Sequence, residues 1–260
     1  MEKVSVFLAD WQVLFREGIH FTLSGEEDID VIGETTNNEE ALNFIETNQP
    51  RIAILNADHS EFTGINLTCR IQQNLPSVSV ILIMDSDNGE QLLSAMKCGA
   101  SACVTKDIDP DALVKLIREI VQGASPISEA LLRPEIASRV VEEFENFSFI
   151  NKEVGNLLAR LSPRESEVLH CIADGNSIEQ LTSTLGIKEE VIRNQLGVIR
   201  TKLVANEHNR EVVEAAQRGL PSAISRVRRG KAVEYITKDE FDAFKESLRE
   251  RFKSLSGELG

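Results

Sequence analysis

Residues 161–203 contain three helical patterns in close succession, and this stretch restricts the fold more strongly than any other. Their sequence is LSPRESEVLHCIADGNSIEQLTSTLGIKEEVIRNQLGVIRTKL. Ser162 and Glu165 form a capping-box pattern at the start of the first helix. Gly175 and Gly186 follow the first and second patterns, because glycine tolerates the left-handed backbone at a helix end. A helix, a tight turn and another helix can together place that last helix in a DNA major groove.

The third pattern predicts a helix over residues 188–203 with one apolar side. The residues expected to be buried on that side are Val191, Ile192, Leu196, Ile199 and Leu203. A small helical bundle that only packs would show a similar periodicity. Periodicity alone therefore leaves a packing role and a DNA-binding role open.

The order of short phrases favours DNA binding. LSPRESEVL, IADGNS, the break at L–GI, VIRNQ and KL resemble the DNA-binding domain of LuxR-type (NarL-type) regulators, and the resemblance covers residues 161–220 without a gap. It implies a four-helix domain with a helix-turn-helix. It also implies a recognition helix that turns these residues toward DNA: Lys188, Val191, Arg193, Asn194, Gln195, Val198 and Lys202.

Side-chain chemistry at three of these positions suits base recognition. The amides of Asn194 and Gln195 can read an adenine edge, and Arg193 can read guanine or hold a phosphate. Two positions depart from the family pattern: Glu190 stands where the family usually has a basic or polar residue, and Val191 replaces the usual Thr. Glu189 and Glu190 open the helix, where acidic side chains suit the positive end of the helix dipole but repel phosphate. Their role is therefore either helix capping or a weakened or altered DNA affinity.

Residues 1–123 alternate strand and helix patterns five times. Strands are predicted at 4–10, 28–34, 51–57, 77–85 and 102–106, and helices at 13–24, 38–48, 64–75, 88–98 and 110–122. Five such units predict an α/β fold, a doubly wound parallel sheet with a site at the C-terminal ends of its strands. The phrases FLAD, FREGI, VIGE, TGINL and CGASACVTKD resemble the receiver domain of two-component response regulators.

That resemblance implies a phosphorylation site, most of which this sequence has replaced. In a working receiver, two adjacent acids and an acceptor Asp hold Mg²⁺. A Thr or Ser and a Lys complete the site. The matching positions here are Asp10, Trp11, Asn56, Met84 and Lys106, and the switch aromatic position is Cys103. An amide cannot form an acyl phosphate, and one carboxylate beside a lysine is a poor Mg²⁺ cage.

We therefore predict a receiver that acts independently of phosphorylation, with no metal and no cofactor. Lys106 is expected to bond Asp10 or the oxygen of Asn56 and so hold the strand ends together. Asp58 is the one substitute acceptor, because a period of two could place it on the same side as Asn56. Trp11 is expected to fill space beside this site, or else to stack on a ligand.

The expected domains are a receiver-like domain at 1–123, a linker with a helix at 124–156, a helix-turn-helix domain at 157–220 and an extension at 221–260. In the linker, residues 134–147 predict an amphipathic helix that packs on a neighbouring domain or forms a dimer seam. The extension holds a basic run with Arg226, Arg228, Arg229 and Lys231, which are candidate contacts to the DNA backbone. Its last helix, at 237–255, has an apolar stripe for docking or dimerisation formed by Phe241, Phe244, Leu248, Phe252 and Leu255.

Charge and cysteine content refine this prediction. The net charge is −14, and residues 1–160 hold 12 Lys and Arg against 26 Asp and Glu. Phosphate neutralisation drives most DNA affinity, so we expect modest binding by a monomer and a gain from dimerisation. The four cysteines lack metal-ligand spacing and are expected to be buried, reduced thiols in the cytoplasm. A redox role for Cys98 with Cys103, which lie close in sequence, is the alternative.

Together these features predict a cytoplasmic, dimeric transcription regulator that binds double-stranded DNA and is not an enzyme. No apolar run reaches membrane-spanning length, and a membrane partner is not expected. The rival hypothesis is an interaction protein, whose receiver and C-terminal helix recruit partners while its helix-turn-helix has lost specific DNA binding.

Overall fold

The structure is a computed structural model, and it describes residues 3–57, 63–148 and 158–219. Residues up to His208 form one compact unit, and a second unit begins at Asn209. Three predictions concern residues outside the described ranges: the substitute acceptor Asp58, the basic run at 226–231 and the helix at 237–255. None of the helices in the described ranges combines the length and apolar character needed to cross a bilayer.

Five parallel strands form one sheet in the order β2-β1-β3-β4-β5. They are β1 (Val4–Ala9), β2 (Ile29–Thr35), β3 (Ile52–Asn56), β4 (Ser79–Met84) and β5 (Ala102–Thr105). The helices between and after them are α1 (Val13–Ser24), α2 (Asn38–Asn48), α3 (Gly64–Asn74), α4 (Gly89–Lys97) and α5 (Pro110–Val121). The predicted doubly wound α/β fold is confirmed, and each boundary lies within two residues of its expected place.

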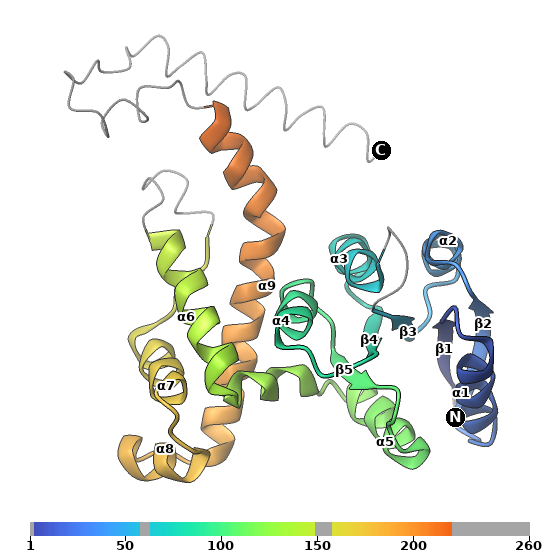
Figure 1. Ribbon diagram of the computed structural model, residues 1–260, viewed down its shortest axis with the longest axis horizontal. Helices are drawn as coiled ribbons and strands as arrows, with labels where there is room; N and C mark the ends of the chain where they lie inside the picture. Colours follow the sequence, from blue (N-terminus) through green and yellow to red (C-terminus); the bar gives the residue numbers. More distant parts are fainter. Residues whose placement is uncertain (1–2, 58–62, 149–157, 220–260) are drawn as a thin grey trace. The chain divides into compact units, whose positions relative to one another are not determined.

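Helices cover both faces of this sheet, with α2, α3 and α4 on one side and α1 and α5 on the other (Figure 1). Because successive strand residues point to opposite faces, the central strands are apolar at almost every position. In β3, Ala53 and Leu55 pack under α2–α4, while Ile52 and Ile54 pack under α1 and α5. This two-sided burial explains the continuous apolar runs in the sequence.

The remaining described helices belong to the linker and the helix-turn-helix. They are the 3-10 helix η1 (Pro126–Leu132), α6 (Pro134–Ser148), α7 (Pro163–Ala173), α8 (Ile178–Leu185) and α9 (Glu189–Gly219). The capping box of Ser162 and Glu165 is present, and Gly175 and Gly186 adopt φ of 87° and 63°. The third helix was expected to end at residue 203, but it continues without a break to Gly219.

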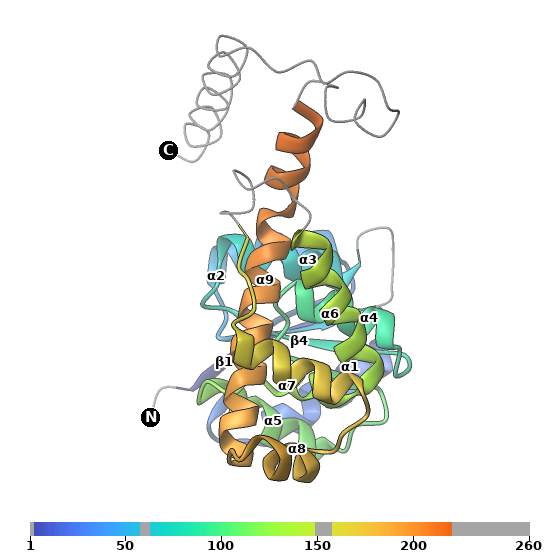
Figure 2. The ribbon, with the colours of Figure 1, turned by 90° about the vertical axis from the view of Figure 1, so that its left-hand side faces the viewer.

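Helix α6 lies beside α7 and α9, and the apolar cluster under α2–α4 continues into all three (Figures 1 and 2). Ile136 and Val140 of α6 are fully buried in this cluster. The linker helix therefore packs on neighbouring helices, which was one of its two expected roles. The side chain of Phe147, expected on the same face, is outside the described part.

Polar contacts tie the end of α4 to α6 and α9. Lys97 Nζ lies 2.7 Å from Glu143 Oε1 and 3.2 Å from Glu207 Oε2. Arg200 Nη2 donates to the backbone carbonyls of Gly99 (2.9 Å) and Ala100 (2.7 Å). The α4–β5 turn is therefore the point of the receiver that holds the DNA-binding part.

The cysteine prediction was wrong for two of the four residues. Cys69 of α3 and Cys98 at the end of α4 form a disulfide, and only Cys103 and Cys171 are free. Cys98 consequently pairs with a residue 29 positions away and not with the nearby Cys103. The sequence held no signal for this pairing, because it depends on how α3 packs against α4.

Two glycines give a matched test of how closely the start of α3 packs against β3. A Cβ at Gly64 would lie 2.1 Å from the backbone oxygen of Asn56, whereas a Cβ at Gly18 on α1 would meet nothing within 4 Å. We expect Gly64→Ala to lower the free energy of unfolding by about 3 kcal/mol, because backbone must move. Gly18→Ala should raise it by roughly 0.5–1 kcal/mol through its helix propensity. Urea unfolding measures both, and equal effects would show that α3 does not start as close to β3 as described.

Candidate DNA-binding helix and altered receiver site

The first turns of α9 form the candidate recognition surface. Helix α8 starts with a second capping box, from Ser177 and Gln180, and ends at Gly186 in the left-handed region. This short turn sets the direction in which α9 leaves. Of the seven residues expected to face DNA, five are exposed and two are partly buried; the exposed ones are Lys188, Val191, Arg193, Asn194 and Val198.

The sequence predicted two positions for Val191, one in the apolar core and one facing DNA. The structure contradicts the first. Its side chain is 41% exposed, so it is not a core residue. Ile192, Leu196, Ile199 and Leu203 are buried as predicted. The buried side of α9 is therefore one residue narrower than periodicity indicated, and Val191 stays available as a predicted DNA contact.

Arg193 is held by two carboxylates. Its Nε donates to Glu189 Oε1 (2.9 Å), and Nη2 lies 2.8 Å from the same oxygen. Its Nη1 forms an ion pair with Glu129 of η1. The hydrogen bond to Glu189 is the main reason that the pKa of Arg193 lies above its ordinary value. A DNA phosphate or guanine could reach this guanidinium only by displacing Glu129 or Glu189.

Lys202 and Gln195 are the two partly buried members of the predicted set. Lys202 Nζ donates to Glu165 Oε2 (2.6 Å) and to the Arg160 carbonyl (3.0 Å), which links α9 to the start of α7. The Oε1 atom of Gln195 is buried and has no hydrogen-bond partner in the described ranges. Both side chains would have to turn outward to contact DNA, and their role there stays a prediction.

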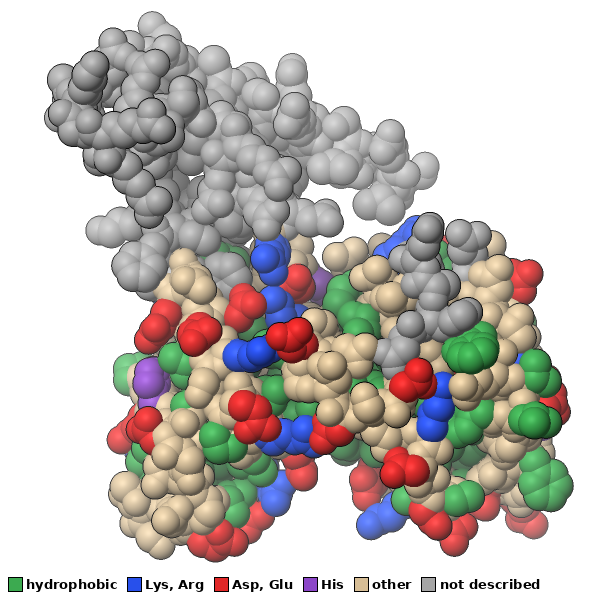
Figure 3. Space-filling view, in the orientation of Figure 1, with side chains coloured by type: hydrophobic (Ala, Val, Ile, Leu, Met, Phe, Trp, Pro, Cys, Tyr) green, Lys and Arg blue, Asp and Glu red, His purple; other side chains and the backbone are tan. Residues whose placement is uncertain are grey.

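The surface around these helices is not strongly basic. In Figure 3 the described side chains of the face shown are a mixture of red and blue, without a broad blue area. Glu189, Glu190 and Glu179 are acidic residues in the first turns of α8 and α9. Such an acidic start suits the helix dipole, but it lowers the attraction for phosphate.

At the other candidate site, the C-terminal ends of β1 and β3 meet through a direct hydrogen bond. Asn56 Nδ2 donates to Asp10 Oδ2 at 2.8 Å, and both residues are buried. The backbone N–H of Gln12 donates to the other oxygen, Asp10 Oδ1, at 2.7 Å. Each oxygen of the one remaining carboxylate therefore already accepts a hydrogen bond from the protein.

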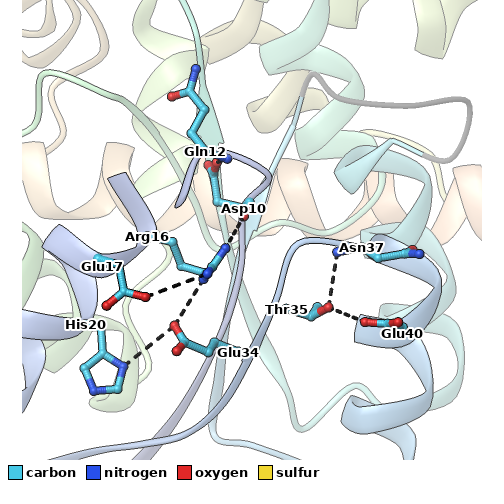
Figure 4. Close-up of polar contacts among 9 residues, drawn as sticks. All are labelled: Asp10, Gln12, Arg16, Glu17, His20, Glu34, Thr35, Asn37 and Glu40. Carbon is cyan, nitrogen blue, oxygen red and sulfur yellow. Dashed lines mark hydrogen bonds and ion pairs between the residues drawn. The ribbon is translucent and has the colours of Figure 1, made fainter. Parts of the chain in front are cut away.

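Arg16 closes the same region from α1 (Figure 4). Its Nη1 donates to the Asp10 carbonyl (3.0 Å), and its Nε donates to Glu34 Oε2 (3.1 Å) at the end of β2. The Arg16 side chain is only 10% exposed. Arg16 belongs to the phrase FREGI, but the sequence did not indicate these partners, because they come from two strands that are adjacent only in the fold.

Lys106 does not bond Asp10 or Asn56, so that expectation was wrong. It forms an ion pair with Asp85, which follows β4. Its ammonium also lies 5.6 Å from the centre of the Trp11 ring and 5.9 Å from that of Phe15, within cation–π range. Trp11 is 40% exposed and stands beside the lysine rather than filling the site. Met84 points into the core and is 3% exposed.

Comparisons with known proteins agree with both halves of this structure. Residues 6–118 match the response regulator receiver domain, and residues 159–215 match the luxR family of bacterial regulatory proteins. The transcriptional regulatory protein DegU of Brevibacillus brevis is 25% identical over 84% of this chain and 94% of its own length. The nitrate/nitrite response regulator protein NarL of Escherichia coli is 26% identical over 74% of this chain and 85% of its own length.

A crystal structure of a LuxR-family two-component response regulator from Aurantimonas sp. SI85-9A1 is 26% identical, with a TM-score of 0.46. It covers 55% of this chain and 98% of that one. The two matched domain families, and not this structural likeness, show that the chain belongs to the LuxR-type response regulators. As in that family, the DNA-binding transcription regulator is built from a receiver and a helix-turn-helix domain joined by a linker.

Response regulator receivers are expected to hold Mg²⁺, and the residues of this receiver do not fit that ion. Mg²⁺ needs several oxygen ligands in octahedral geometry. Here the Asn56 amide directs an N–H at Asp10, and both Asp10 oxygens are engaged. The described residues hold no cluster of three or more His, Cys, Asp or Glu side chains suited to a metal.

The contact between Lys202 and Glu165 gives a prediction with a pH signature. Burial opposes ionisation of Glu165, but hydrogen bonds from Lys202 and the Ser162 backbone prevail, so its pKa lies below its ordinary value. We expect Lys202→Met to lower the free energy of unfolding at pH 7 by about 1.5–3 kcal/mol, the usual range for a hydrogen bond to a charged group.

The sign of the pH dependence follows from the lowered pKa. A carboxylate with a depressed folded-state pKa stabilises above its ordinary pKa, near 4.3, and loses this contribution as pH falls through the folded value. The difference in the free energy of unfolding between the wild type and Lys202→Met should therefore become smaller below about pH 4.3. Urea unfolding across pH measures it, with Lys188→Met as the exposed control. A gap independent of pH would remove Glu165 as the partner.

Proposed function

We propose that this response regulator controls transcription by binding double-stranded DNA through the first turns of α9, and that its receiver works without phosphorylation. The observation that carries the second part is the hydrogen bond from Asn56 to Asp10. It puts a neutral amide where the family has its acceptor carboxylate. It also uses the one acid of the former metal site as a structural acceptor.

The ends of the sheet are held by contacts that do not depend on a phosphoryl group. Asp10 joins β1 to β3 through Asn56, Arg16 joins α1 to β2 through Glu34, and Lys106 joins β5 to Asp85. With its charges already paired, this receiver is expected to hold one arrangement, and another signal must act on it.

The DNA-binding half of the proposal rests on the exposed side chains of α9. Asn194 is exposed and has the amide geometry for an adenine edge. Arg193 is nearby but engaged with Glu129 and Glu189. Affinity should be modest for one chain, and a homodimer, acting in the cytoplasm, would double the contacts. The basic residues at 226–231 and the helix at 237–255 remain proposed contributors to DNA contact and pairing.

One observation favours the rival hypothesis of an interaction protein. On α1, Leu14 is 89% exposed and Phe21 is 84% exposed, with Gly18 open between them. Large apolar side chains exposed on one helix face are typical of a protein contact. A protein partner, or a second copy of this chain, could bind there. This surface is compatible with DNA binding, so it does not replace the first proposal.

Phosphorylation independence is tested directly by chemical labelling. Incubation with acetyl phosphate and Mg²⁺ should leave the mass of the chain unchanged, because Asn56 cannot form an acyl phosphate. DNA binding should be the same before and after the treatment. A receiver with an aspartate acceptor serves as the positive control. A hydroxylamine-labile phosphoryl adduct on Asp58 would overturn the proposal, since that residue is the remaining candidate acceptor.

Base recognition is tested at Asn194. Asn194→Ala should weaken binding to the preferred DNA site by about 1–3 kcal/mol, the usual value of a bidentate base contact, and leave non-specific binding nearly unchanged. Glu190→Lys is the matched variant, because it adds positive charge on the same turn and should tighten binding to every sequence. Gel-shift titration on specific and random duplexes separates the two. Equal losses on both duplexes for Asn194→Ala would mean that it does not read a base.

A further inference from the structure

The Cys69–Cys98 disulfide lies at the point where the receiver holds the DNA-binding part. Cys69 is on α3 and partly exposed, and Cys98 follows the last residue of α4 and is 7% exposed. Their Cα atoms are 4.3 Å apart, near the short end of the distances that disulfides span. The bond fastens the C-terminal end of α4 to α3.

The residues that flank Cys98 make the docking contacts. Lys97, one position before it, pairs with Glu143 of α6 and Glu207 of α9. Gly99 and Ala100, the next two positions, offer the carbonyls that accept from Arg200. The receiver residues that make these contacts therefore all lie within two positions of Cys98 in the sequence.

The geometry of this turn depends on α3 as well as on α4. The Cys98 N–H donates to Ser94 O, which keeps the residue on the end of α4. Gly99 has φ of 89° and packs against Gln72 of α3, where an added Cβ would lie 2.9 Å from the Gln72 side chain. A bond between α3 and Cys98 thus holds the Gly99 and Ala100 carbonyls where Arg200 needs them.

We propose that Cys69 and Cys98 form a thiol–disulfide modification site, oxidised by peroxide or by a low-molecular-weight disulfide, whose oxidation strengthens the docking of α9 on the receiver. Partly exposed Cys69 is the thiol that reacts first. Its thiolate attacks peroxide, forming a sulfenic acid and releasing hydroxide, which takes up the thiol proton to give water. The Cys98 thiol then attacks that sulfur, forming the S–S bond and releasing a second water. In total, two thiols and one hydrogen peroxide become one disulfide and two waters. With a low-molecular-weight disulfide, the Cys69 thiolate displaces one small thiol to form a mixed disulfide, and the Cys98 thiol then displaces the second. Two protein thiols and one small disulfide thus become one protein disulfide and two small thiols.

The other two cysteines are matched controls within the same chain. Cys103 lies on β5, and burial raises the pKa of its thiol to about 12, which leaves it protonated and unreactive. Cys171 lies on α7 and is partly buried. Neither is joined to a second sulfur, and neither flanks the residues that hold Lys97 or Arg200 in place.

The test uses the full chain, reduced with dithiothreitol and then oxidised with hydrogen peroxide or with glutathione disulfide. Alkylation followed by mass spectrometry should show a linked Cys69–Cys98 peptide, with Cys103 and Cys171 still alkylated. Hydrogen exchange should slow by about fivefold or more, the lower end of usual coupling factors, both at residues 97–100 and in α9 around Arg200. Neither readout involves DNA, so this proposal can fail independently of the proposed function.

Variants separate linkage from docking. Cys69→Ala should show the reduced-state exchange under both conditions, whereas Cys103→Ser should respond like the wild type. Arg200→Met should still form the disulfide but lose the redox effect on α9. The reduced and oxidised wild type share one sequence, so a folding defect in a variant cannot imitate the result. Failure of both oxidants to link the pair, or linkage with unchanged exchange around Arg200, would overturn the proposal.

Discussion

A partly buried guanidinium joins α9 to the receiver in this response regulator. Arg200 has a pKa lowered by burial, and it donates two hydrogen bonds to backbone carbonyls of the α4–β5 turn. A buried charge without partners is costly, so removing α9 from the receiver must return this group to water or to another acceptor. The Nε of the same side chain is buried and has no partner among the described residues. An unmade hydrogen bond costs about 1–3 kcal/mol, which offsets part of what the two bonds to Gly99 and Ala100 contribute to docking.

In the proposed phosphorylation-independent receiver, fixed contacts take the place of a chemical site. Asn56 stands at the position expected for the acceptor aspartate, and its amide has a similar shape but cannot form an acyl phosphate. It donates to Asp10, so the pair needs no metal to offset two neighbouring carboxylates. Lys106 would otherwise be an unpaired cation at this edge, and Asp85, Trp11 and Phe15 surround it. The residues at these positions therefore satisfy one another's charges and hydrogen bonds, as expected when local and long-range interactions favour the same structure.

Local patterns predicted the elements of this fold well, and long-range contacts escaped them. Strand and helix periodicity located the sheet, and the capping box at Ser162 located the start of α7, because both depend on neighbours in sequence. The 3-10 helix η1 and the continuation of α9 past Leu203 were missed, since no breaker or period marks them. The Cys69–Cys98 bond, the Lys106–Asp85 pair and the Arg200 contacts join residues from different elements. No single-sequence pattern could have paired them.

Helix α9 carries both Arg193, a proposed DNA contact, and Arg200, which docks on the receiver, without a break between them. Arg193 and Arg200 lie seven residues apart on one unbroken helix, a rise of about 10 Å. Because the helix is continuous between the two arginines, a rotation of this segment that frees Arg193 from Glu129 would also displace Arg200 from Gly99 and Ala100. Under the proposed function, DNA that binds Arg193 therefore competes with both sets of contacts. A break between a recognition helix and the following helix would have allowed the first to turn alone. Under the proposed function, release of Arg200 from the receiver and release of Arg193 for DNA are therefore expected to occur together.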